Sequence, residues 1–158
     1  MKTIESHSIK YGLITTTLLI VYFLAMKSFG LVHNVNLRFF NGIIMTIGVY
    51  LAISTYKKHN VQEFNYLTGI GIGVFTSLVV AILFSAFISI YIIAFPDFLA
   101  KIKLYEPQGI YLNQMAIAII LFIEAMASGC MISFISMQWL KKTHGVPAHT
   151  SGGYSLNH

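Results

Sequence analysis

The chain has 158 residues, of which 56% are hydrophobic and 9% are charged, and its formal net charge is +5. A soluble domain carries about 25% charged residues and leaves much of its surface in water, so this composition excludes a soluble globular domain. The basic residues stand singly or in pairs at the ends of apolar runs, which is typical of membrane proteins and argues against a nucleic-acid-binding surface.

Four apolar segments are long enough to cross a bilayer, because a membrane-spanning helix needs about 20 largely apolar residues. They lack the alternation of barrel strands, so helices are predicted. In chain order, the predicted spans are residues 11–31, 37–56, 67–95 and 109–140. We expect the first to be retained rather than cleaved as a signal, since it lacks a small-x-small cleavage site. The predicted fold is an all-α membrane four-helix bundle, a single domain over residues 1–142.

The segment between the third and fourth spans is bracketed by Pro96 and Pro107. Asp97 is placed to cap a helix, and apolar residues recur at helical spacing: Phe98, Ile102 and Tyr105. This pattern favours a short helix lying in the membrane interface, with an irregular surface loop as the alternative. Residues 143–158 form a polar tail that we expect to be disordered on its own.

The basic residues near the spans predict the orientation. Six lie on the side of the two termini: Lys2, Lys10, Lys57, Lys58, Lys141 and Lys142. Four lie on the other side: Lys27, Arg38, Lys101 and Lys103. This bias predicts that both termini are cytoplasmic, because cytoplasmic loops carry the excess of Lys and Arg.

Small residues recur at every fourth position of the third span: Gly69, Gly73, Ser77, Ala81, Ser85 and Ser89. The fourth span repeats the pattern with Ala125, Gly129 and Ser133, and the second has a weaker version in Gly48 and Ala52. Small side chains let helix backbones approach closely in lipid, where apolar burial gives helices little reason to associate. We interpret these positions as a helix-packing seam; the alternative is a pore or groove lined by hydroxyl groups.

Glu124 lies near the midpoint of the fourth span, and a carboxyl group at that depth is a functional hypothesis by default. Ser128 is one turn further along the same helix face, and Thr46 is among the polar residues at comparable depth on other helices. Three interpretations stay open. Glu124 could be a neutral acid that donates to a hydroxyl group, a carrier of protons or cations, or the partner of a basic residue on another subunit.

The residues offer no catalytic set. We find no nucleophile–base pair, paired carboxylates or cluster of metal ligands, so the sequence predicts neither an enzyme, nor a metal, nor a cofactor. The six histidines lie outside the apolar runs and are expected to be solvated. Cys130, the only cysteine, is expected to behave as a small buried hydrophobe.

Several short motifs resemble a known family. The first span begins Lys10-Tyr-Gly-Leu-Ile14, the second ends Tyr56-Lys-Lys-His59, and the third is followed by Phe95-Pro-Asp-Phe98. In this order the motifs are similar to the four-span inner-membrane proteins of Bacteroidota classed as domain of unknown function 4199. The resemblance covers the chain up to Lys142 and implies a bacterial inner-membrane location, but no activity, ligand or catalytic residue.

From these features we expect a non-enzymatic membrane protein, an accessory or structural subunit of a larger membrane assembly. Its expected partners are membrane lipids and other membrane-protein subunits. The alternative is a small proton- or cation-translocating protein that uses Glu124.

Overall fold

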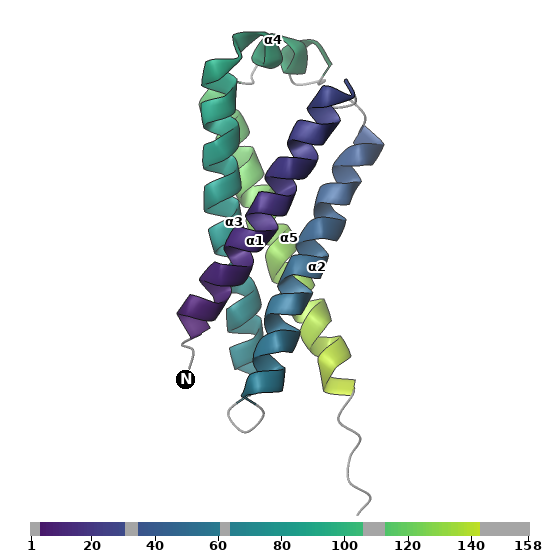
Figure 1. Ribbon diagram of the computed structural model, residues 1–158, viewed down its shortest axis with the longest axis vertical. Helices are drawn as coiled ribbons and strands as arrows, with labels where there is room; N and C mark the ends of the chain where they lie inside the picture. The colour runs from purple at the N-terminus through teal and green to yellow at the C-terminus, as the bar shows by residue number, and fades with distance from the viewer. Residues whose placement is uncertain (1–3, 31–34, 61–63, 106–112, 143–158) are drawn as a thin grey trace, which may run out of the picture.

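A computed structural model describes residues 4–30, 35–60, 64–105 and 113–142. Over these ranges the chain is helical, with no strand, and the helices are α1 (Ile4–Ser28), α2 (Val35–His59), α3 (Tyr66–Ala94), α4 (Pro96–Tyr105) and α5 (Gln114–Lys142). The four long helices run alternately up and down, so α1 begins and α5 ends at the same end of the bundle (Figure 1). The predicted all-α four-helix bundle is confirmed. The polar tail lies outside the described residues.

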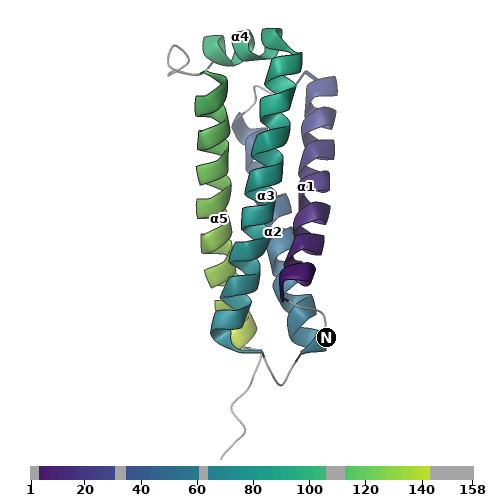
Figure 2. The same cartoon turned by 90° about the vertical axis from the view of Figure 1, so that its left-hand side faces the viewer.

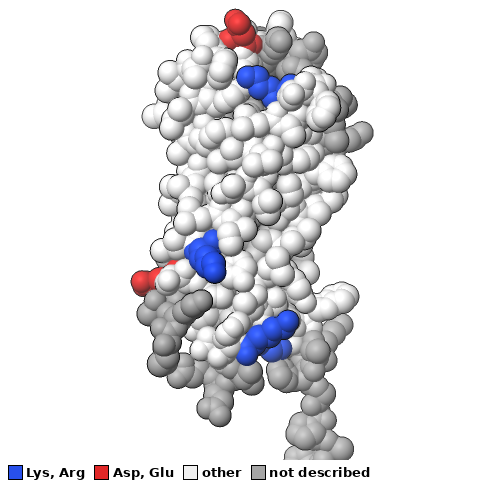
Figure 3. All heavy atoms as spheres, in the orientation of Figure 1, with Lys and Arg blue, Asp and Glu red and all other residues white. Residues whose placement is uncertain are grey.

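Each of the four long helices contains a segment long and apolar enough to cross a membrane: Ile4–Ser28, Phe39–His59, Tyr66–Ala94 and Gln114–Leu140. Large apolar side chains cover the outside of all four, with Val21 58%, Ile47 54% and Ile90 67% exposed. On the face drawn in Figure 3, a broad band without Lys, Arg, Asp or Glu separates the charged groups towards the two ends. Lipid accommodates such a surface and water does not, so the chain is a multi-pass membrane protein.

The first helix begins earlier than the apolar pattern predicts. It starts at Ile4 rather than at residue 11, and it ends at Ser28, shortly before Gly30 adopts a φ of +68°. The polar start continues the helix because His7 and Ser8 are buried. Glycine adopts this left-handed conformation without steric cost and commonly ends helices.

The short helix predicted between the third and fourth spans is present, and the loop alternative is wrong. α4 begins at Pro96, the residue type favoured at the first helical position, and Asp97 falls in its first turn. α4 lies across one end of the bundle (Figure 1), where Phe98 and Leu99 pack against buried residues of α1, α3 and α5. The fourth span begins at Gln114, after Asn113, whose side-chain oxygen accepts a hydrogen bond of 2.7 Å from the backbone N–H of Ala116.

The interior consists of two apolar clusters. The lower cluster, near the start of α1, draws on α2, α3 and α5 and contains Met45, Val49, Ala52, Ile53, Tyr56, Ile72, Met137 and Leu140. The upper cluster, near α4, draws on α1, α3 and α5 and contains Leu19, Val80, Phe84, Ile88, Ile92 and Ile117. Figure 2 shows α5, α3 and α1 side by side, with α2 behind them.

Buried hydroxyl groups occupy the interior between these clusters. Ser8 of α1 donates to the carbonyl oxygen of Ile72 in α3 at 3.5 Å. Five others each donate to the carbonyl oxygen four residues earlier in their own helix, at 2.7–2.8 Å, and the donors are Thr15, Thr16, Thr76, Ser77 and Ser133. A buried hydroxyl must find an acceptor, and the helix backbone supplies one without a partner from another helix. These five groups are therefore satisfied locally.

Candidate functional site

The small residues of α3 and α5 meet over the lower half of the bundle. A Cβ atom on Gly73 would collide with the Ser133 side chain, and one on Gly129 would collide with Ser77. One turn further down, a Cβ atom on Gly69 would collide with Met137, a neighbour that the sequence pattern did not suggest. The backbones of α3 and α5 therefore approach as closely as small-residue contacts between membrane helices allow.

In the part of the α3 stripe nearer α4, the small residues differ in how far they are buried. Ala81 is buried and Ala125 packs beside the lower cluster, whereas Ser85 and Ser89 are half-buried. Their hydroxyl groups donate to the carbonyl oxygens of Ile82 at 3.2 Å and of Ser85 at 2.9 Å, both within α3. The hydrogen bonds that these two serine hydroxyl groups donate therefore lie within α3.

A second close approach joins α1 to its neighbours. A Cβ atom on Gly12 would lie 2.7 Å from Val79 of α3, and one on Gly48 of α2 would collide with Thr15 of α1. Gly48 was predicted as part of a weak stripe, but Gly12 was not. A single glycine has no periodicity, so the sequence pattern gave no signal for it.

Glu124 lies on the outside of the bundle. Its side chain is exposed, although it also takes part in an interaction within the chain. The apolar span of α5 runs from Gln114 to Leu140, so Glu124 is about 5 Å from its midpoint along the axis at 1.5 Å per residue. α5 therefore presents a carboxyl group deep in the membrane, towards its lipid-facing side.

α5 is also the least covered of the four spans. In its most apolar stretch 6% of the residues are buried, compared with 44% in α3 and 28% in both α1 and α2. α5 packs mainly against α3, and against α2 lower down, where Met45 approaches Gly129. Many of its other large apolar side chains are exposed, among them Ile119, Ile123 and Ile135.

The two other predicted intramembrane polar residues do not surround Glu124 as a buried cluster. Thr46 is exposed on α2 and donates to the carbonyl oxygen of Gly42 at 2.7 Å. Ser128 is half-buried, one turn below Glu124 on α5. The carboxyl group therefore belongs to the outer face of α5 rather than to a polar site inside the bundle.

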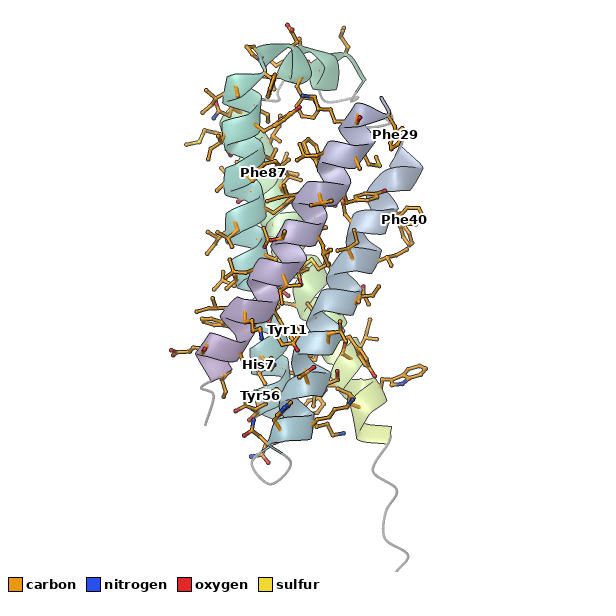
Figure 4. All side chains as sticks on the ribbon, in the orientation of Figure 1. His7, Tyr11, Phe29, Phe40, Tyr56 and Phe87 are labelled. Carbon is orange, nitrogen blue, oxygen red and sulfur yellow. The ribbon has the colours of Figure 1, made fainter. Side chains whose placement is uncertain are left out.

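A histidine at the lower end is buried, which the sequence did not predict. His7 was expected to be solvated, but it is 8% exposed and its Nε2 lies 3.0 Å from the carbonyl oxygen of Ala52 in α2. Its ring lies between Tyr11 and Tyr56, with ring centroids 4.8 and 5.3 Å away (Figure 4). Because a carbonyl oxygen accepts, Nε2 carries the proton in this contact. The expectation failed because α1 extends below its apolar run and packs this polar segment against α2.

A group of aromatic residues at the upper end joins α1, α3 and α4. The Phe23 ring makes edge-on contacts with Phe87, Tyr91 and Phe98, at centroid distances of 5.2–6.0 Å. Lys27 places its Nζ 4.6 Å from the centroid of the Tyr91 ring and 4.0 Å from that of Phe95. A cation over aromatic faces at these distances is attracted to them, so Lys27 ties the end of α1 to the end of α3.

The contacts described above pack the helices against one another. Within the described ranges no group of three or more His, Cys, Asp or Glu residues could hold a metal ion. Cys130, expected to be buried, is half-buried on α5. In comparisons with protein-family models, with curated proteins and with solved structures, no match to this chain was found.

Proposed function

We propose that this chain is a non-enzymatic subunit of a larger assembly in a bacterial inner membrane, and that the outer face of α5 joins it to its neighbours. One observation carries the proposal: the helix least covered by its own bundle is the one that carries an exposed carboxyl group deep in its span. The bacterial location rests on the resemblance to the four-span Bacteroidota family, and the lysine bias supports cytoplasmic termini.

The energetics favour a protein neighbour over lipid at this face. An acidic residue at the centre of a membrane helix costs about 2.5–3.5 kcal/mol on insertion scales. Polar groups from a neighbouring helix reduce that cost, because side-chain hydrogen bonds between membrane helices contribute about 0.6–2 kcal/mol each. If α5 packs against another subunit, Glu124 lies within reach of polar groups of that neighbouring helix.

Proton or cation translocation through Glu124 is the second candidate, and the geometry gives it less support. Among the described residues, five buried hydroxyl groups donate to carbonyl oxygens of their own helices, so these five do not form a chain of donors and acceptors through the bundle. Glu124 lies outside this interior. A Glu124→Gln variant in a liposome flux assay tests the idea, because a carrier role requires flux in the parent protein and its loss in the variant.

The subunit proposal is tested by extracting the protein from its native membrane with mild detergent and measuring the mass of the native particle. We expect a particle larger than one chain and its bound lipid. Glu124→Ala should dissociate that particle, whereas Thr46→Ala should not, because Thr46 is exposed on α2 and already satisfied by Gly42. A wild-type chain that runs alone contradicts the proposal.

A further inference from the structure

We propose that Lys27 and the hydroxyl group of Tyr91 bind the phosphate of an anionic phospholipid at the end of the bundle that α4 covers. The ammonium group of a lysine and the hydroxyl group of a tyrosine both donate hydrogen bonds, and a lipid phosphate offers acceptor oxygens and a negative charge. The inference is independent of the proposed subunit role, because it concerns the ends of α1 and α3 rather than the outer face of α5.

Both residues lie at the depth of phospholipid headgroups. The apolar span of α1 runs to Ser28 and that of α3 to Ala94, so Lys27 and Tyr91 each fall in the last turn of a span. The two helices finish at the same end of the bundle, where α4 lies across it (Figure 1). Tyrosine and lysine at such positions reach the headgroup region, where the surrounding lipid supplies phosphate groups.

The Tyr91 hydroxyl group is a buried donor without an acceptor. The residue is 7% exposed, and within the described part of the chain its hydroxyl oxygen has no hydrogen-bond partner. By contrast, the hydroxyl groups of Thr76 and Ser77, deeper in α3, donate to carbonyl oxygens of their own helix. Buried polar groups are nearly always hydrogen-bonded, so the Tyr91 hydroxyl group points to a partner from outside these helices.

Neighbouring rings hold Tyr91 in place. Phe23 of α1 and Phe98 of α4 contact its ring edge-on, with centroids 5.2 and 5.4 Å away, and the Phe95 ring lies 4.9 Å away. A ring held by three others keeps its hydroxyl group in one position. Little conformational freedom is therefore lost when that group binds a ligand, which favours binding.

Lys27 supplies the positive charge. Its Nζ lies 4.6 Å from the centroid of the Tyr91 ring, and the phenol oxygen is on the rim of that same ring. An ammonium group has three N–H donors, and contact with ring faces leaves donors for an acceptor. Lys27 is exposed, so its flexible side chain can rotate away and admit a phosphate to the buried hydroxyl group. One phosphate group then accepts hydrogen bonds from both residues.

The charges at this end favour an anionic headgroup. α4 carries Lys101 and Lys103 against Asp97, so together with Lys27 these residues are net positive. Phosphatidylglycerol presents a phosphate without a compensating cation. Phosphatidylcholine adds a quaternary ammonium group, which Lys27 repels. We therefore expect the site to prefer phosphatidylglycerol.

Thermal unfolding of the delipidated protein in a neutral detergent tests the inference, because a ligand that binds only the folded protein raises its unfolding temperature. A short-chain phosphatidylglycerol should raise the unfolding temperature of the wild type more than phosphatidylcholine of the same chain length. Tyr91→Phe, which keeps the ring, should lose at least half of that rise. An equal rise with both lipids, or in both proteins, overturns the inference.

The lipid-free proteins provide a second readout that does not depend on lipid. Tyr91→Phe should unfold at the same or a higher temperature than the wild type, because it removes a buried hydroxyl group that has no partner. A lower unfolding temperature would show that the hydroxyl group already has a partner within the protein, and it would overturn the inference.

A matched pair of lysine variants tests the charge. Lys27→Met should lose at least half of the rise with phosphatidylglycerol, each variant being compared with its own lipid-free form. Lys103→Met, exposed on α4 at the same end, should keep the rise. Equal loss in the two variants would show general attraction to positive charge and overturns the Lys27 site.

Inorganic phosphate distinguishes a free anion from a lipid. At the concentration of the added lipid, we expect inorganic phosphate to leave the unfolding temperature unchanged, because a lipid phosphate is held at the membrane depth of the site. A rise with inorganic phosphate that equals the rise with phosphatidylglycerol and is lost in Tyr91→Phe overturns the lipid as the ligand.

Discussion

Ser77 of α3 and Gly129 of α5 pack so closely that a Cβ atom on Gly129 would collide with the Ser77 side chain. The Ser77 hydroxyl group donates to Gly73 in its own helix, so the contact depends on shape rather than on an inter-helix hydrogen bond. In lipid, where apolar burial gives helices little reason to associate, such close contact supplies much of the attraction between them.

Two glycines of α3 that are two residues apart should respond to alanine with opposite signs. Gly73→Ala introduces a methyl group that collides with Ser133, and overpacking of this kind costs about 1–3 kcal/mol. Gly71→Ala meets no atom within 4 Å, and its better helix propensity should stabilise the fold by up to about 1 kcal/mol. Unfolding in increasing denaturing detergent, followed by circular dichroism, gives both values. Equal stability of the two variants would show that the α3–α5 contact is looser than described.

Lys57 should stabilise the end of α5. Its Nζ donates to the carbonyl oxygen of Leu140 at 3.0 Å, and a cation at a helix C-terminus contributes about 0.3–1 kcal/mol. Lys57→Met should therefore speed hydrogen exchange in the last turn of α5 by about two- to fivefold. Lys58→Met is the matched control, because Lys58 is exposed on the same turn of α2. Equal protection in the two variants contradicts the capping role.

Replacing His7 should weaken the attachment of α1 to α2. His7→Ala removes the hydrogen bond to Ala52 and the ring packed against Tyr11 and Tyr56, so we expect a loss of about 1–3 kcal/mol. His59→Ala should change stability by less than about 0.5 kcal/mol, because His59 is exposed at the end of α2. Thermal unfolding in one detergent compares them. An unaffected His7→Ala protein would mean that the lower end of α1 is held by other contacts.

The contact of Lys27 with the aromatic rings should appear as a coupling energy between α1 and α3. In a double-mutant cycle with Lys27→Met and Phe95→Leu, we expect a coupling of about 0.5–1 kcal/mol, typical of a cation over an aromatic ring at an exposed site. Lys27→Met with Ile93→Leu is the control cycle, since Ile93 is exposed on the same helix and has no aromatic ring. A coupling no larger than that of the control contradicts the contact.

The sequence predicted the features that follow from repetition. Four apolar runs predicted the four long helices, and the proline and helical spacing after Phe95 predicted α4. The stripe of small residues at every fourth position of α3 also predicted glycines that approach another helix, although only the lower part of the stripe contacts α5. Regular patterns predict these features because a membrane helix must form its backbone hydrogen bonds within itself. Its length and its packing face therefore follow from the residue types along that one segment.

The features that the sequence did not predict depend on how the helices cross. His7 is polar and lies outside an apolar run, so only the packing of α1 against α2 reveals that it is buried. Gly12 approaches Val79 without belonging to any repeat. The depth of Glu124 could be read from the apolar run. Its direction was left open, and it follows from the contacts of Gly129 with Ser77 and of Ser133 with Gly73, which set how α5 is rotated against α3.

The proposed subunit role requires that a protein neighbour covers the outer face of α5 in the membrane. Nitroxide labels at Ala127 and Val21, each in a Cys130→Ser background, measure this through their collisions with lipid-dissolved oxygen in native membranes. We predict that the label at Ala127 is shielded and that the label at Val21, 58% exposed on α1, is fully accessible. Equal accessibility at the two positions would contradict the claim that α5 is a subunit interface.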